Sequence, residues 1–122
     1  FICEGVIYFL EKEAVEQTFD FVVNHSGTGS QLAFDYFPPE VTDGTSNSKL
    51  GKEMYKLVQK IGEPYKFGMD EDEMNDFLKK HRFTNINNYS TIDIRNTHFH
   101  GDNKKTEVSR LFKFVCATTQ GV

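Results

Sequence analysis

Two acidic residues stand where short apolar runs end, and these positions suit chemistry. Glu4 closes the run Phe1–Glu4, and Asp35 comes at the end of the run Gln31–Tyr36. A carboxylate at the end of a buried strand in an open α/β sheet lies where such sheets bind ligands. We therefore expect Glu4 to lie near a ligand, and the simpler alternative is a solvated acid at a strand end.

Three further residues belong to the same candidate region. Tyr8 follows Glu4 in the next loop, where it either lines a pocket or packs as an aromatic ring on the next helix. Asp35 and Tyr36 end the second run and are expected to border the same side as Glu4. They either shape a substrate pocket or form a turn before the two prolines at 38–39.

Other suggestive patterns have simpler explanations. The glycines in 27–29 follow a helical pattern and precede a strand, the reverse of the order needed for phosphate binding at a helix N-terminus. His98, His100 and Asp102 could bind a metal, but their spacing fixes no complete ligand set. The acids of 70–76 lack the glycine that a calcium loop needs, and they match the dipole at a helix start. We expect no metal site.

Composition limits the classes of function. The chain has 122 residues, 38% of them hydrophobic, and a formal net charge of −4, which suits one globular domain or part of one. The basic residues are scattered, which argues against a nucleic-acid partner. No apolar stretch approaches the ~20 residues of a membrane span, so we expect no membrane partner. The two cysteines make no disulfide framework, and we expect free thiols and a cytoplasmic location.

Hydrophobic periodicity predicts alternating strands and helices. Strands are expected at 1–4, 31–36, 83–89 and 109–118, and helices at 11–24, 50–61 and from 70 to about 82, while 91–96 is ambiguous. The first strand is expected to be buried. The apolar stripes of the first two helices are Val15, Phe19, Val22 and Val23, and then Leu50, Met54, Leu57, Val58 and Ile61.

This order predicts an α/β fold. Strands separated by helices favour parallel pairing and a sheet covered on both faces, and the last two strands lack a clear connecting helix. We therefore expect a Rossmann-like mixed sheet of about four strands flanked by helices, with the last pair antiparallel. We see no linker, so residues 1–122 are treated as one unit.

Several segments together resemble a known family. Residues 1–10, with the step Cys3-Glu4-Gly5, residues 29–36, residues 62–68 and the final Arg110-Leu111-Phe112 are similar to the second half of S-adenosylmethionine-dependent methyltransferases of the leucine carboxyl methyltransferase type. Tyr8 stands one position early relative to that pattern. The family's glycine-rich turn and its ribose-binding acid are missing from this chain.

The resemblance implies a partial domain. The chain would supply strands four to seven of a seven-stranded sheet, with its first strand beside its second and its last strand on the second's other side. Glu4 and Gly5 would contact S-adenosylmethionine in the full-length protein, and Tyr8, Asp35 and Tyr36 would line the pocket for the methyl acceptor. The implied partners are the missing N-terminal half of the domain and a small-molecule or protein acceptor.

The expected reaction is methylation of an oxygen. Some amino-group methyltransferases carry Asp or Asn directly before Pro-Pro, whereas this chain has Phe37 before Pro38 and Pro39. The isolated chain is expected to be inactive. The alternative from another class is a small, non-catalytic α/β interaction module that pairs with a partner through the exposed edge of its first strand.

Overall fold

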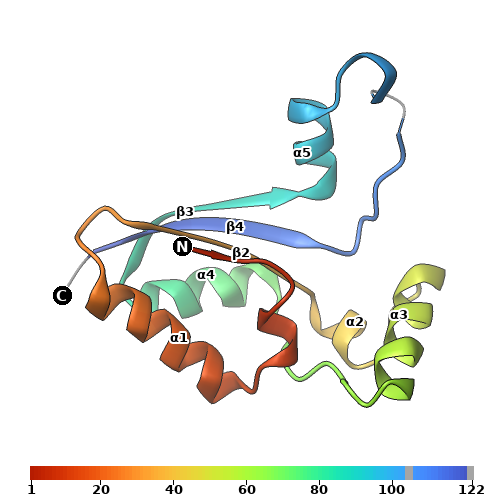
Figure 1. Ribbon diagram of the computed structural model, residues 1–122, viewed down its shortest axis with the longest axis horizontal. Coiled ribbons are helices and arrows are strands. Elements are labelled where there is room, and N and C mark those ends of the chain that lie inside the picture. Colours follow the sequence, from red (N-terminus) through yellow and green to blue (C-terminus); the bar gives the residue numbers. More distant parts are fainter. Residues whose placement is uncertain (104–105, 121–122) are drawn as a thin grey trace.

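A mixed sheet of four strands forms the centre of the molecule (Figure 1). The computed structural model describes residues 1–103 and 106–120. The strands are β1 (Ile2–Cys3), β2 (Gln31–Tyr36), β3 (Phe83–Ser90) and β4 (Lys113–Thr119), in the spatial order β1-β2-β4-β3. β1 is parallel to β2, and β4 is antiparallel to both of its neighbours. The predicted α/β fold, with a mixed four-stranded sheet and an antiparallel last pair, is confirmed.

Five α-helices are described around this sheet. They are α1 (Lys12–His25), α2 (Pro39–Thr42), α3 (Lys49–Lys60), α4 (Glu71–Lys80) and α5 (Thr91–His98), with 3₁₀ turns at Ile7–Phe9 and Gly101–Asn103. The predicted helices at 11–24, 50–61 and 70–82 are confirmed to within a few residues. Within the described part of the chain, no helix combines the length and the apolar character needed to cross a membrane.

The core lies between one face of the sheet and two helices. Side chains alternate between the two faces of a strand, so Leu32, Phe34 and Tyr36 of β2 share one face. α1 and α4 cover that face (Figure 1). The α1 stripe is buried as predicted, and α4 adds the buried residues Met74, Phe77 and Leu78.

The opposite face of β1, β2 and β4 has no helix over it among the described residues (Figure 1). α5 instead projects beyond the end of β3. The expectation of a sheet covered on both faces is therefore wrong for this chain. The expectation of a buried first strand is also wrong, because only two residues pair and Ile2 is 80% exposed on this open face.

α3 forms as predicted, but only part of its apolar stripe is buried. It packs inward through Gly51 and Val58, and a Cβ on Gly51 would come within 2.8 Å of the Ser46 hydroxyl oxygen. This close approach of the backbone turns most of the stripe outward. Leu57 and Ile61 are 57% and 61% exposed.

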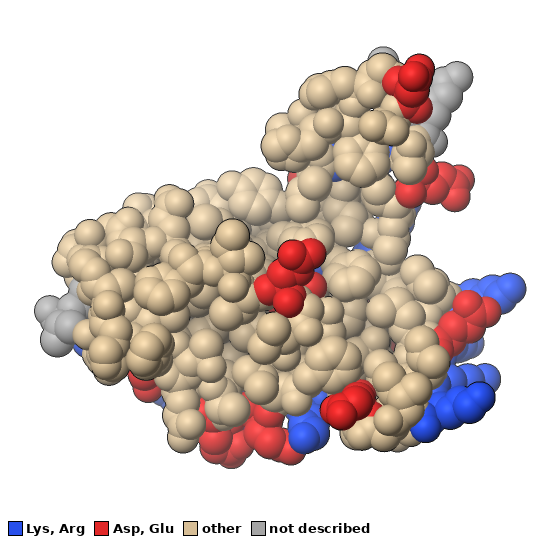
Figure 2. All heavy atoms as spheres, in the orientation of Figure 1, with Lys and Arg blue, Asp and Glu red and all other residues tan. Residues whose placement is uncertain are grey.

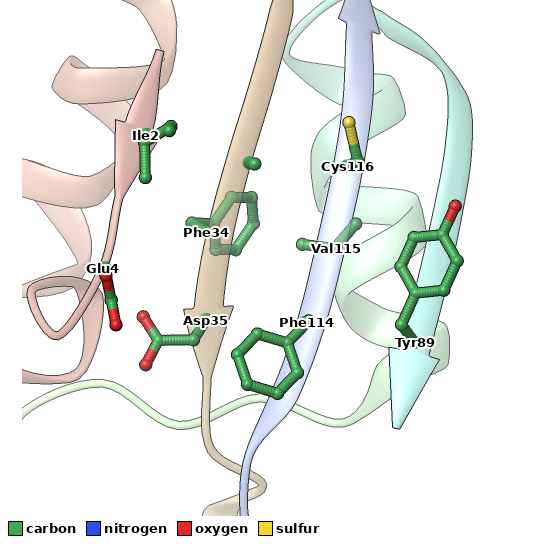
Figure 3. Close-up of a pocket in the computed structure, with 9 residues that line it drawn as sticks. Ile2, Glu4, Phe34, Asp35, Tyr89, Phe114, Val115 and Cys116 are labelled. Carbon is green, nitrogen blue, oxygen red and sulfur yellow. The ribbon is translucent and has the colours of Figure 1, made fainter. Parts of the chain in front are cut away.

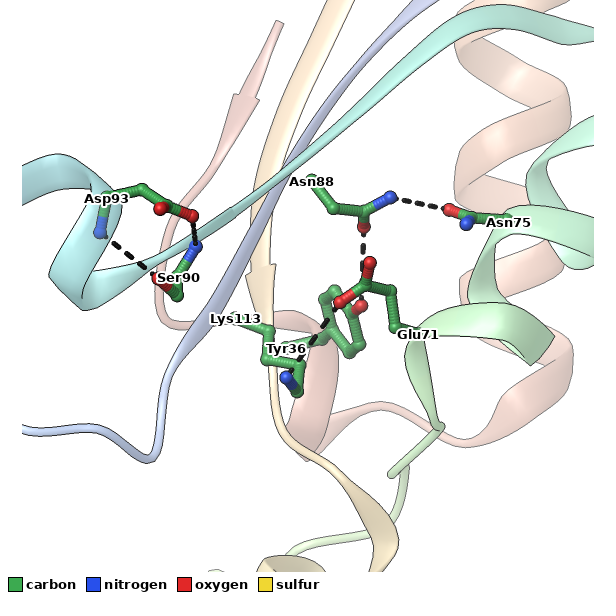
Figure 4. A network of polar contacts seen from close by, with 7 residues as sticks. All are labelled: Tyr36, Glu71, Asn75, Asn88, Ser90, Asp93 and Lys113. Atoms are coloured by element: carbon green, nitrogen blue, oxygen red, sulfur yellow. Dashed lines mark hydrogen bonds and ion pairs between the residues drawn. The ribbon is translucent and has the colours of Figure 1, made fainter.

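The ambiguous segment 91–96 belongs to α5. Ser90 accepts a hydrogen bond from the backbone N–H of Asp93, and the Asp93 carboxylate accepts one from the backbone N–H of Ser90 (Figure 4). This capping box satisfies two backbone donors at the helix start. The Ser-x-x-Asp spacing was a usable signal for a helix in the sequence.

The register predicts that both thiols stay free. Cys3 lies opposite Phe34 and Cys116 opposite Ala33, so β2 separates them. Two strand spacings place the cysteines roughly 9–10 Å apart, beyond the ~7 Å between Cα atoms that a disulfide allows. Mass spectrometry of a non-reduced sample, alkylated after denaturation, should find two labelled cysteines per chain. An intramolecular Cys3–Cys116 bond would contradict the strand order.

Candidate functional site

The open face of the sheet carries a shallow hollow of about 320 Å³ (Figure 3). β1 and β2 are parallel, so their carboxyl ends meet at one edge of the sheet, and the hollow reaches this edge. It is lined by Ile2, Glu4, Ala33, Phe34, Asp35, Tyr89, Phe114, Val115 and Cys116. The two carboxylates come from β2 and from the turn after β1, and the rest of the lining is mostly apolar.

Asp35 joins the turn after β1 to the end of β2. Its side chain is on the open face, yet the residue is only 4% exposed. The backbone N–H of Gly5 donates a 2.8 Å hydrogen bond to Oδ1, and the Tyr8 hydroxyl lies 3.5 Å from Oδ2. A buried carboxylate needs such donors because burial without partners is costly. Asp35 therefore fixes the turn that carries Glu4.

Gly5 is required by the shape of this turn. Its φ is +70°, in the left-handed region that side chains other than glycine rarely adopt. A Cβ at Gly5 would lie 3.6 Å from the Tyr8 hydroxyl oxygen, an ordinary contact. The cost of a larger residue at Gly5 is therefore in the backbone conformation rather than in a clash.

Tyr8 belongs to an aromatic cluster as well as to the site. Its ring stacks on Phe37 at 4.4 Å between centroids and meets Tyr65 edge-on at 5.6 Å. Burial, followed by the nearby Asp35 carboxylate, raises the pKa of Tyr8 above its usual range. The hydroxyl therefore stays protonated at neutral pH and serves as a donor. Packing on neighbouring rings is thus observed, while a role in a substrate pocket stays a prediction.

Glu4 is exposed, and its carboxylate lies beside that of Asp35 in Figure 3. Carboxylates accept hydrogen bonds from hydroxyl or ammonium groups and attract cations. The neighbouring Phe114 and Tyr89 offer apolar surface at the same hollow. The arrangement suits a ligand that combines polar donors or a positive charge with a flat apolar part.

Tyr36 does not belong to this group. The expectation that Asp35 and Tyr36 border the same side is wrong, because consecutive strand residues point to opposite faces. Tyr36 is fully buried on the helix side, with its hydroxyl 3.5 Å from the side-chain oxygen of Asn88 (Figure 4). Burial, then Glu71 and Asp70, raises the pKa of Tyr36 above its usual range.

The sequence did not identify the floor of the hollow. Phe114, Cys116 and Tyr89 come from β4 and β3, far along the chain from Glu4. Phe114 and Cys116 are two residues apart in a strand and therefore share a face. That alternation was visible in the sequence, but only the strand order shows that this face meets Glu4.

A second cluster of titratable groups joins two helices on the other side of the sheet. His81 is nearly buried, with Nδ1 2.8 Å from an Asp20 carboxylate oxygen and Nε2 3.7 Å from one of Glu16. The imidazole ring also contacts Phe19 and Phe77. These contacts hold α1 against the end of α4.

Within residues 1–103 and 106–120, no three His, Cys, Asp or Glu side chains are grouped so that they could hold a metal ion. His98 is the last residue of α5 and His100 follows it, whereas Glu4 follows β1 and Asp35 belongs to β2.

Comparison with known proteins supports the fold. No protein-family model matches the chain, and no curated protein matches it significantly. A solved structure called a possible exported protein from Bordetella parapertussis is similar over 98% of this chain, with a TM-score of 0.63 and 14% sequence identity. At that identity the likeness shows the fold alone. The present chain spans only 38% of that protein's length.

Replacing Asp35 should destabilise the fold much more than replacing Glu4. Asp35→Ala leaves the Gly5 N–H without its partner, which should lower the free energy of unfolding by about 1–3 kcal/mol. Glu4→Ala removes an exposed carboxylate and should change stability by no more than about 0.5 kcal/mol. Urea denaturation of both variants measures the difference. Equal losses would show that Asp35 does not hold the turn.

Proposed function

We propose that this chain is the C-terminal part of an S-adenosylmethionine-dependent O-methyltransferase, which transfers a methyl group to a carboxyl or hydroxyl oxygen. One observation carries the proposal. Glu4 and Asp35 meet at the shared carboxyl ends of two parallel strands, beside a sheet face that the described residues leave open. In open α/β sheets, ligands bind outside the carboxyl ends of the strands.

The strand order gives further support. The resemblance implied that the first strand lies beside the second and that the last strand lies on the second's other side. The observed order β1-β2-β4-β3, with an antiparallel last strand, agrees with this arrangement. Strand order is a property of the fold, so it supports the family without identifying the acceptor.

The chemistry of the hollow fits the proposed cofactor. S-adenosylmethionine, when bound, supplies a methyl group on a positively charged sulfur. Glu4 would accept hydrogen bonds from ribose hydroxyls or the ammonium group, and Asp35 would keep the Glu4-Gly5 turn in place. Phe114 and Tyr89 would contact the apolar part of the ligand. The enzyme would also have to position the acceptor oxygen in line with the methyl group.

The open face would be covered by a front half of the same domain. Ile2 is exposed there, and β1 pairs only with β2 among the described strands. A preceding parallel strand would pair with the free edge of β1 and complete the crevice. The acceptor is a small molecule or a protein.

The free edge of β1 also supports a second candidate function. An exposed edge strand can add a strand from a partner, so the chain could act as a non-catalytic interaction module. The coding sequence upstream of Phe1 discriminates between the two. A strand, a glycine-rich turn and a helix encoded there favour the enzyme.

The 122 residues alone should bind S-adenosylmethionine weakly or not at all. The crevice then lacks one wall and the turn that would hold the cofactor. Isothermal titration calorimetry with this chain should give no resolvable heat of binding. Tight binding to these 122 residues would reject the half-site account.

In a chain that includes the front half, Glu4→Ala should weaken S-adenosylmethionine binding by about 1–3 kcal/mol, the cost of an unmatched polar partner. Glu13→Ala is the control, because Glu13 is an exposed acid in the first turn of α1, on the other side of the sheet. Equilibrium binding measurements compare the dissociation constants. An unchanged value for Glu4→Ala would remove Glu4 from the cofactor site.

A further inference from the structure

The outer surface of α3 combines apolar and basic side chains in two parallel rows. Leu50, Met54, Leu57 and the C-cap residue Ile61 recur at i, i+4, i+7 and i+11, so they form one stripe along the helix. Gly51 and Val58 are buried on the inward side and Met54 packs partly against the core, while Leu50, Leu57 and Ile61 are exposed. Leu50, Leu57 and Ile61 therefore remain on the outer surface of α3, without a partner among the described residues that buries them.

The basic row runs beside this stripe. It consists of Lys49, Lys52, Lys56 and Lys60, all exposed. The single acid of the helix, Glu53, lies 4.0 Å from Lys49 in an exposed ion pair. The helix thus has a formal charge of +3 in a chain with a net charge of −4. Figure 2 shows basic side chains gathered at the corner of the molecule that α3 forms.

We infer that α3 docks on the surface of an anionic lipid bilayer. A helix with an exposed apolar stripe and a row of lysines lies in a membrane interface, with the apolar side chains among the acyl chains and the lysines at the headgroups. Charge complementarity selects an anionic surface. α3 stands at an outer corner of the fold, where it can meet a flat surface (Figure 1).

The shape of α3 disfavours a peptide partner. An amphipathic peptide usually binds in a groove, and none of the three hollows described in this fold is lined by α3 residues. The expectation of no membrane partner rested on the lack of an apolar stretch long enough to span the bilayer. Docking on the bilayer surface does not need such a stretch. The inference does not depend on the proposed methyltransferase function, because it uses neither Glu4 nor the open sheet face.

Vesicle co-sedimentation tests this inference with the whole chain. The probes are phosphatidylcholine vesicles with and without about one-third phosphatidylserine, at low and high salt. We expect binding only to the phosphatidylserine vesicles, weakened by salt. Removing charge by Lys52→Gln, Lys56→Gln and Lys60→Gln together should lower the affinity on the order of 100-fold, about fivefold for each lysine. Leu57→Gln with Ile61→Gln should lower it at least roughly tenfold.

Matched control variants distinguish binding through α3 from nonspecific binding to vesicles. Phe21→Gln removes an exposed apolar residue of α1, and Ile2→Gln removes one from the open sheet face. Lys79→Gln with Lys80→Gln removes exposed charge from α4. These variants should bind like the unaltered chain, and circular dichroism should show every variant folded. The inference is overturned by absent binding, by equal losses in the controls, or by lysine-dependent binding to polyglutamate without binding to vesicles.

Discussion

The helices α1 and α4 cover only one face of the sheet, and much of the structure depends on this one-sided burial. Phe19 contacts both Phe34 and Phe83 on the helix side, so phenylalanine rings make up much of the core. The alternation of β2 and β4 then sends the intervening residues to the open face. Ala33, Asp35, Phe114 and Cys116 are therefore the floor of a hollow rather than a second core layer.

Asp35 is a buried polar residue on the open face of the sheet. It is nearly buried although its side chain is on the open face, because the turn after β1 folds over it and donates the Gly5 N–H. Tyr8 extends this link to the aromatic cluster with Phe37 and Tyr65. The backbone turn that carries Glu4 is thus held from two sides.

Local sequence patterns predicted the helices and strands well, but they did not predict which faces of these elements are covered. The α1 stripe and the strand 31–36 formed as expected, because periodicity reports which residues share a face. It does not report whether anything covers that face, so the first strand was expected to be buried, whereas Ile2 is exposed. Tyr36 was misplaced for a simpler reason, since it alternates with Asp35. The joining of Gly5 to Asp35 depends on strand order, which only the resemblance supplied.

The central claim is that Glu4 and the open face form one wall of a cofactor crevice. A crystal structure of a chain that includes the preceding front half, with bound S-adenosylhomocysteine, tests it most directly. The account predicts a strand paired with the free edge of β1, the open face buried, and the Glu4 carboxylate hydrogen-bonded to the ligand. A ligand bound away from Glu4, or an open face still exposed to solvent, would contradict it.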